Sequence, residues 1–340
     1  MKANNYYIFS ETKTNRLGKN LKIIKISTVQ LTDSLRSRLS YLKLPKSDKL
    51  FIYEIEVEND EISPNFENDI YYDDSSIAIH KLLCDKDAFY GSSSRRINRI
   101  LGSIIEYRDD DNNISIKGDG GWKSLKDLFD ILRSSNVKYL VLRKFETLPM
   151  SFLEGDHDID ILCESINEIV LTTGATKRNE GISAFCLYIS GIKTDFDIRY
   201  IGDNYLDSQW ARNALNNRKC NNGVFIMDDE NQLFTIIYHC LTQKNNISDY
   251  YSDKIATISM RLFGNKLPNA DTELCLYLAR YMTSNAYGYI KPKDISVIQN
   301  KNNIQIIKKE MKKLCLSPNS HALKNRLLTK VRRLFPRNQR

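Results

Sequence analysis

Aspartates alternate with apolar residues in two separate segments of the chain. The first reads DIDI at 158–161 and the second reads DFDI at 195–198. Successive side chains of a strand point to opposite faces, so alternation puts the carboxylates of each segment on one face, about 7 Å apart. Like charges on one face repel each other, which makes this arrangement costly without a cation. If the two strands are neighbours, Asp158, Asp160 and Asp197 converge on one point.

Three converging carboxylates favour a divalent cation. Mg²⁺ takes oxygen ligands, usually one or two carboxylates together with substrate phosphates, and such a set can hold two ions for phosphoryl transfer. We therefore predict Mg²⁺ or Mn²⁺ as the cofactor, with Asp158, Asp160 and Asp197 as metal ligands and catalytic residues. Two alternatives stay open: Asp195 replaces Asp197 as the third ligand, or the aspartates line a solvated strand face.

Two cations follow directly after an apolar segment at 138–142, which we predict to be a strand. Arg143 is well placed to bind a phosphate through two parallel hydrogen bonds, and Lys144 is its neighbour. We predict both as nucleotide- or phosphate-binding residues. The alternative for Arg143 is a structural ion pair with Glu146 or Glu154.

Three further residues are candidates for substrate contacts. Arg199 lies two residues after Asp197 and shares its strand face, where it either binds a donor phosphate or offsets the carboxylates. His239 lies in a strongly apolar helical segment, and Lys244 follows it. We predict His239 and Lys244 as substrate contacts, and the alternative for His239 is a packed, hydrogen-bonded core residue.

The order of these pieces resembles the nucleotidyltransferase fold of the DNA polymerase β-like superfamily. The matching pieces are a strand at 139–142, the Asp-Ile-Asp-Ile segment at 158–161 and Phe196-Asp197-Ile198, within residues 122–245. The resemblance implies that Asp158 and Asp160 bind the metals. It also implies that Asp197 binds one metal and helps to deprotonate the acceptor hydroxyl.

One element of that family is different here. The family usually has Gly-Gly or Gly-Ser after the first strand, where backbone N–H groups cradle a phosphate, whereas this chain has Arg143-Lys144-Phe145-Glu146. The Asp-Ile-Asp strand end is also similar to a LicD-like branch, whose members transfer phospho-choline or phospho-alditol groups from CDP-linked donors to surface glycans. That branch has a Gly-rich element that this chain lacks.

The elements that must position these residues follow from periodicity. Residues 1–115 read as a β-rich accessory module, and the polar, Gly-rich stretch at 108–121 reads as a domain boundary. We predict an α+β fold: a nucleotidyltransferase-like mixed sheet with helices at 122–245, then a helical C-terminal part at 246–316. The predicted strands are 6–9, 21–26, 51–58, 138–142, 159–163, 187–192 and 196–201, and the predicted helices are 93–102, 122–134, 232–244, 252–263 and 271–283.

Charge is distributed unevenly along the 340 residues. Twelve Lys and Arg against one acid give residues 301–340 a charge of +11, so the rest of a chain of net charge +8 carries −3. Residues 317–340 have one apolar stripe among these cations, the pattern of a basic amphipathic tail. Such a tail can bind an anionic membrane, dock on the protein itself, or bind RNA or DNA.

The remaining composition narrows the location of the protein. No run of 18 apolar residues and no apolar leader stretch occur, so we expect a cytoplasmic protein, or one peripheral on the inner face of the membrane. The seven Cys are scattered without C-x-x-C pairing, which indicates reduced thiols.

Together these features predict a Mg²⁺-dependent transferase of a nucleotidyl or phospho group. The donor would be nucleotide-linked, and the acceptor would be a hydroxyl of a surface-polysaccharide or lipid-linked glycan. Two alternatives stay open: an enzyme that transfers NMP to RNA or protein, as in toxin–antitoxin systems, and a non-catalytic protein that binds nucleic acid or glycan.

Overall fold

The computed structural model describes residues 6–10, 21–30, 33–40, 49–57, 99–108, 113–153, 157–244, 246–268 and 270–316. The predicted basic tail at 317–340 lies outside the described residues, as does most of the predicted helix at 93–102, of which residues 99–102 are helical. Among the described helices, none is both long and apolar enough to cross a lipid bilayer.

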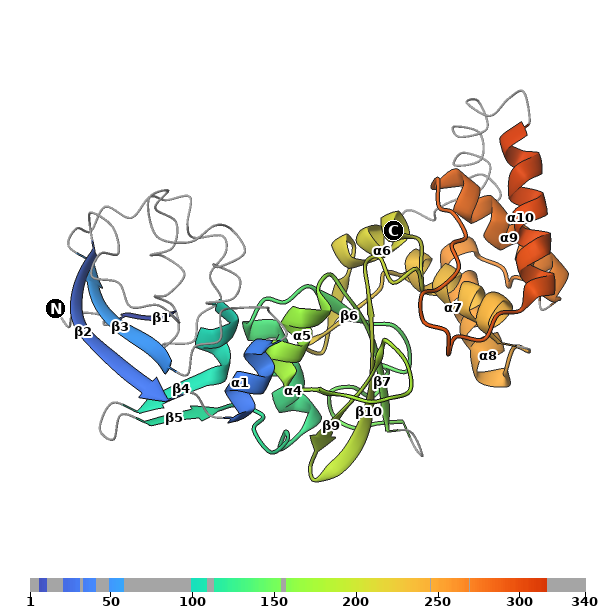
Figure 1. The fold of residues 1–340 in the computed structure, drawn as a ribbon. Coiled ribbons are helices and arrows are strands. Elements are labelled where there is room, and N and C mark those ends of the chain that lie inside the picture. Colours follow the sequence, from blue (N-terminus) through green and yellow to red (C-terminus); the bar gives the residue numbers. More distant parts are fainter. Residues whose placement is uncertain are drawn as a thin grey trace.

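A mixed sheet of seven strands forms the centre of the fold, which confirms the predicted α+β class (Figure 1). The strands, in spatial order, are β11 (Lys219–Asn221), β12 (Val224–Ile226), β6 (Tyr139–Val141), β7 (Asp158–Cys163), β10 (Ile192–Tyr200), β9 (Ala184–Ile189) and β8 (Thr176–Lys177). Strand β10 runs parallel to β7, and β6 runs antiparallel to it. The two aspartate-bearing strands are therefore direct neighbours.

Helices cover both faces of this sheet (Figure 1). One face packs against α1 (Asp33–Ser40), α4 (Leu125–Ser134) and α5 (Ile166–Thr173). The other face packs against α6 (Ser208–Asn216) and α7 (Asp229–Gln243). The same apolar cluster includes residues of α8 (Asp249–Phe263), α9 (Asp271–Ser284) and α10 (Lys301–Leu316).

Burial on both faces explains the composition of β7. Ile159 and Ile161 enter the core on the α4 side, and Leu162 enters the core on the α7 side. Because side chains alternate, Asp158 and Asp160 lie on the same face as Leu162. The aspartates therefore belong to the sheet face that α6 and α7 cover.

Most predicted elements have somewhat different bounds in the structure, and two of the differences have a clear physical cause. The helix predicted from Trp122 begins only at Leu125, because the Ser124 hydroxyl accepts a hydrogen bond from the Asp127 amide at 3.1 Å and caps it. Trp122 is instead buried and forms a bridge with Ile189. Sequence periodicity placed Trp122 on the helix because it falls in phase with the apolar stripe.

The strand predicted at 187–192 was also wrong. Strand β9 ends at Ile189, and β10 begins at Ile192. Between them Ser190 and Gly191 have φ values of 52° and 77°, which form a two-residue hairpin turn. The dipeptide Ser190-Gly191 is itself a turn signal in the sequence, and the apolar residues on both sides of it led to the prediction of one strand instead.

The N-terminal region forms an antiparallel sheet of three described strands, which agrees with its predicted β character. Its order is β1 (Tyr6–Ser10), β3 (Lys49–Val57) and β2 (Leu21–Gln30). Two shorter strands, β4 (Ile105–Arg108) and β5 (Asn113–Ile116), form a hairpin, and β5 lies inside the stretch at 108–121 predicted as a domain boundary.

That stretch does not interrupt the core. Leu35 of α1, Ile104 and Ile116 are buried in the same apolar cluster as Leu128 and Phe129 of α4. Residues of α1 and of 99–116 thus pack into the core of the sheet domain, and a separate accessory module at 1–115 stays a prediction. Within the stretch that indicated a linker, Ser115 and Lys117 are exposed on either side of the buried Ile116.

Arg38 fastens α1 to the sheet domain. Its guanidinium is buried and donates a hydrogen bond to the Lys117 carbonyl at 3.0 Å. It also lies against Gly174, the left-handed C-cap of α5, where a Cβ would lie 2.4 Å from Arg38 Nη2. Arg38 can therefore occupy this position only because Gly174 has no side chain.

We expect Gly174→Ala to destabilise the fold by roughly 1–3 kcal/mol more than Gly264→Ala does, because it must also break a charged hydrogen bond of Arg38. Gly264 is the matched control: it is the left-handed C-cap of α8, at φ 78°, and no atom lies within 4 Å of a Cβ added there. Chemical denaturation of both variants measures the difference. Equal losses of stability for the two variants would show that the Arg38 side chain moves aside at no cost in free energy.

Candidate metal and phosphate site

The carboxylates of two neighbouring strands meet on the α7 side of the sheet. In the register of β7 and β10, Asp158 lies beside Asp195 and Asp160 lies beside Asp197. One ligand atom from each of Asp158, Asp160 and Asp197 lies within 4.8 Å of the others. The predicted convergence is therefore confirmed, and these three carboxylates can hold a metal ion.

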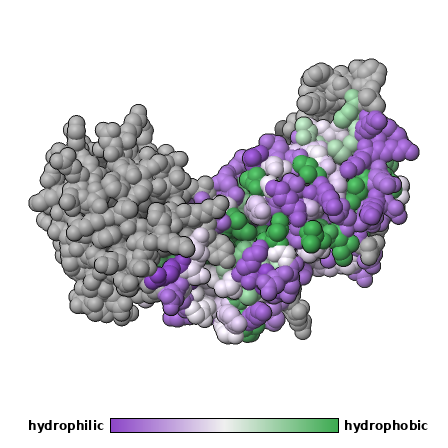
Figure 2. All heavy atoms as spheres, in the orientation of Figure 1, coloured by the Kyte–Doolittle hydropathy of each residue, from purple (hydrophilic) through white to green (hydrophobic). Residues whose placement is uncertain are grey.

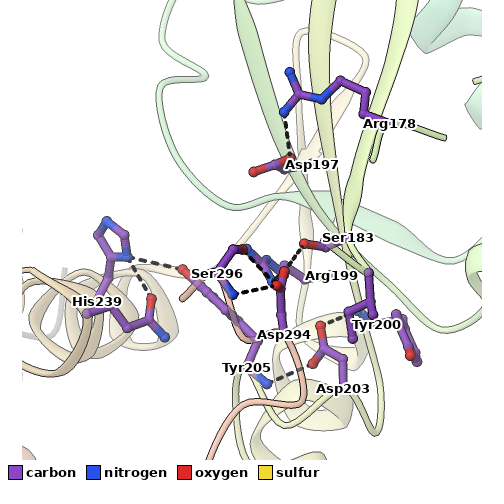
Figure 3. A network of polar contacts seen from close by, with 12 residues as sticks. Arg178, Ser183, Asp197, Arg199, Tyr200, Asp203, Tyr205, His239, Asp294 and Ser296 are labelled. Atoms are coloured by element: carbon purple, nitrogen blue, oxygen red, sulfur yellow. Dashed lines mark hydrogen bonds and ion pairs between the residues drawn. The ribbon is translucent and has the colours of Figure 1, made fainter. Parts of the chain in front are cut away.

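Asp195 is excluded from this group by an arginine. Its carboxylate forms an ion pair with Arg178, which follows directly after β8. The Arg178 guanidinium also reaches to 4.0 Å from Asp197 Oδ1, as Figure 3 shows. Sequence analysis missed Arg178, because only the β8–β9 hairpin brings it beside β10.

The chemistry of the donor set fits a hard cation such as Mg²⁺. All three groups supply carboxylate oxygens, the ligands that Mg²⁺ and Mn²⁺ prefer. Asp197 Oδ1 is also buried without a hydrogen-bond donor among the described residues. A buried anionic oxygen that lacks a donor is costly, and a cation would relieve that cost.

Arg143 binds Asp160 rather than either glutamate that was predicted as its partner. Its Nη2 and Nε atoms lie 2.6 Å and 3.2 Å from Asp160 Oδ2. Glu146 pairs instead with Lys254, and Glu154 lies outside the described residues. Because both contacts go to Oδ2, Arg143 fixes the orientation of the carboxylate and leaves Oδ1 outside the ion pair.

The two facing aspartates have pKa values shifted in opposite directions. Burial acts to raise the pKa of Asp160, but the Arg143 guanidinium outweighs it and lowers that pKa below its usual value. Burial and the nearby charge of Asp160 raise the pKa of Asp197. Asp197 is therefore the more basic of the pair, and Asp160 is held ionised.

Tyr205 connects three of the predicted site residues, although no sequence pattern marked it. Its hydroxyl accepts a hydrogen bond from Arg143 Nη1 at 2.6 Å and lies 3.1 Å from His239 Nδ1. The guanidinium carbon of Arg199 lies 4.5 Å from the centre of its ring. Tyr205 is buried, so these contacts form in a region of low dielectric, where each is strengthened.

His239 is a packed, hydrogen-bonded residue, as one of the two alternatives predicted. Its Nδ1 lies 2.9 Å from Gln243 Oε1 and 3.1 Å from the Tyr205 hydroxyl, so this nitrogen is hydrogen-bonded whichever ring nitrogen carries the proton. Burial and the positive charge of Arg143 lower the pKa of His239 to about 3. The ring is therefore neutral at physiological pH and serves as a hydrogen-bond acceptor.

Arg199 is held by an anion from the far end of the chain. Its Nη1 donates to Asp294 Oδ2 at 2.9 Å, and both side chains are buried (Figure 3). The same oxygen accepts a hydrogen bond from Ser183 at 2.5 Å. Arg199 is thus first of all part of a buried ion pair, in addition to its position beside the aspartates.

All eight residues predicted for the site line one cavity of about 250 Å³. Lys144 and Lys244 supply its lysine ammonium groups, and Tyr251, Val297 and Ile298 supply an aromatic and apolar part. The complete lining is Arg143, Lys144, Asp158, Asp160, Asp197, Arg199, Tyr205, His239, Gln243, Lys244, Tyr251, Ser296, Val297 and Ile298. A ligand in this cavity meets carboxylates, cations and an apolar edge together.

In comparisons with known proteins, no family model, no curated protein and no solved structure matches this chain.

We expect the His239 ring to stay neutral from pH 8 down to pH 5. Its folded pKa, about 3, lies below the unfolded value of about 6.5, so the unfolded chain takes up a proton first as the pH falls. The stability that the neutral ring contributes is therefore lost below about pH 6.5. Long-range ¹H–¹⁵N NMR, with the signal assigned from His239→Gln, measures the titration, and a midpoint near 6.5 would contradict the burial argument.

Proposed function

We propose that this protein is a Mg²⁺-dependent transferase of a nucleotidyl or other phospho group. The donor would be a nucleotide-linked compound, and the acceptor a hydroxyl of a surface-polysaccharide or lipid-linked glycan. The observation that carries this proposal is the meeting of Asp158, Asp160 and Asp197 within 4.8 Å in a cavity that also contains Arg143 and two lysines.

The mixture of charges favours a phosphorylated substrate. Carboxylates alone would repel a phosphate, and a phosphate-binding site made of cations alone would not need carboxylates. The combination fits a phosphate that binds together with a metal ion. Mg²⁺ bound by the three aspartates would neutralise charge that develops on the phosphoryl oxygens. Lys144 and Lys244, with their ammonium groups at the same cavity, would hold donor phosphates outside the metal ligands.

The reaction that fits these residues is an in-line displacement. The oxygen of the acceptor hydroxyl forms a bond to a phosphorus of the donor, and the bond from that phosphorus to the leaving phosphate oxygen breaks. Asp197, with its raised pKa, would accept the hydroxyl proton, while Asp160 stays ionised beside Arg143. Positioning and charge supply most of the catalysis in phosphoryl transfer.

The resemblance to the nucleotidyltransferase fold belongs to this proposal. The adjacency of β6, β7 and β10 in a mixed sheet supports it, because the strand and the two aspartate segments that carry the resemblance become neighbours. The choice of a glycan acceptor depends on the basic tail sequence and on the similarity to the LicD-like branch.

We expect Asp197→Asn and Asp158→Asn to weaken Mn²⁺ binding by about tenfold or more, since each removes a charged ligand of the ion. Asp195→Asn is the matched control: it lies on the same strand face, but its carboxylate belongs to Arg178. Isothermal titration calorimetry with MnCl₂ measures the three affinities. Equal Mn²⁺ affinities of wild type and all variants would remove the metal site from the proposal.

The transfer itself is tested with donors labelled in the phosphate. Label from a CDP-linked or nucleoside triphosphate donor should enter a glycan fraction, depend on Mg²⁺, and disappear in Asp197→Asn but not in Asp195→Asn. Label in RNA or protein would favour the NMP transferase instead. Absence of transfer, with salt-dependent RNA binding that survives Asp197→Asn, would show a binding protein.

A further inference from the structure

The segment between α9 and α10 contributes Ser296, Val297 and Ile298 to the cavity wall, and we call residues 290–298 the strap. Asp294 fixes it to the sheet: its carboxylate is 2% exposed and accepts hydrogen bonds from Arg199 and Ser183 (Figure 3). Gly181 leaves the room for this carboxylate, because a Cβ there would lie 2.8 Å from Asp294 Oδ1. The strap is thus held from β10 and from the start of β9.

Backbone contacts hold the strap at further points. The Lys293 amide donates to the Asp203 carbonyl at 2.9 Å, and Asn204 Nδ2 donates to the Lys291 carbonyl at 3.3 Å. Within the strap, the Ser296 hydroxyl donates to Asp294 Oδ1 at 2.7 Å. The conformation of the strap, and with it the direction of its side chains, is therefore determined by bonds to the sheet domain.

In this fixed conformation the strap presents isoleucines to solvent. Ile295 is 94% exposed, Ile298 is 59% exposed and Ile290 is 41% exposed. These are three of seven large apolar side chains that are exposed among the described residues, and they fall within nine residues of one another. Figure 2 shows hydrophobic residues among hydrophilic ones on one face of the described part of the molecule.

Lysines surround these isoleucines. Lys291 and Lys293 are exposed on the strap itself. Exposed lysines continue along α10, and one of them, Lys308, lies 4.8 Å from the ring centre of Tyr289 at the base of the strap. The one acid of the strap is Asp294, which is buried and paired with Arg199. The exposed surface of the strap is therefore both apolar and cationic.

We infer that the strap docks on an anionic membrane surface. Isoleucines entering the headgroup region gain from burial of apolar area, and neighbouring lysines gain from anionic lipids. Because the strap also supplies Ser296, Val297 and Ile298 to the cavity wall, docking would bring this side of the cavity close to the membrane. This inference goes beyond the proposed chemistry and does not depend on it.

The test uses the full chain and vesicles of phosphatidylcholine with or without phosphatidylglycerol. Co-sedimentation should show binding that requires phosphatidylglycerol and becomes about tenfold weaker in the double variant Ile295→Ser, Ile298→Ser. Lys291→Gln should weaken it about fivefold at low salt. The matched control is Ile192→Ser, an isoleucine that is 50% exposed at the β9–β10 hairpin and should leave binding unchanged.

Several results would overturn the inference. Vesicle binding of the double variant equal to that of wild type would assign membrane binding elsewhere, for example to residues 317–340. An equal loss in Ile192→Ser would show a general effect of surface hydrophobicity. If light scattering shows a dimer for the wild type and a monomer for the double variant, the strap binds a second copy of the chain instead. Asp197→Asn must bind vesicles as wild type does, so failure of the proposed chemistry leaves this test intact.

Discussion

Repulsion between carboxylates on two adjacent strands is the constraint around which this site is organised. Parallel pairing of β7 and β10 forces Asp160 beside Asp197, and both belong to a sheet face that helices cover. Cations offset the repulsion: Arg143 binds Asp160 from the end of β6, and Arg178 binds Asp195 and approaches Asp197 from the sheet edge. Beside these ion pairs, Asp158, Asp160 and Asp197 still bring three carboxylate oxygens within 4.8 Å of one another, an arrangement that can hold a divalent cation.

The acidic part of the site could be predicted from the sequence because the alternation of aspartates with apolar residues is a local pattern. Alternation with period two places Asp158 and Asp160 on one face without any knowledge of the fold, and flanking apolar residues predict buried strands. The choice between Asp195 and Asp197 was not local, because Arg178 decides it from a different hairpin. For the same reason Tyr205 could not be found: it has no periodic context, and its importance comes only from its contacts with Arg143, Arg199 and His239.

The errors in the fold also come from interactions beyond the range of a local pattern. Trp122 is in phase with the apolar stripe of α4, yet its indole donates to the Thr173 carbonyl at 3.0 Å, outside the helix. Ile116 of the polar stretch at 108–121 and Ile105 of the preceding strand are both buried in the core, and together they join the hairpin to it. Composition averages over a window, whereas packing depends on the few apolar residues within it. Long helices such as α7 were predicted well because their apolar spacing persists over several turns.

The second buried ion pair, Arg199 with Asp294, gives the C-terminal helices a role in the site. Burying two charges costs desolvation that their attraction offsets only when further hydrogen bonds satisfy them, and Ser183 and Ser296 provide these bonds to Asp294. Tyr205 joins this pair to the metal site, since its ring contacts Arg199 and its hydroxyl accepts from Arg143. The distance between the aspartates and the strap is therefore set by one continuous polar network. Because that network requires both the sheet and the segment after α9, the cavity forms only when the last third of the chain folds back onto the strands.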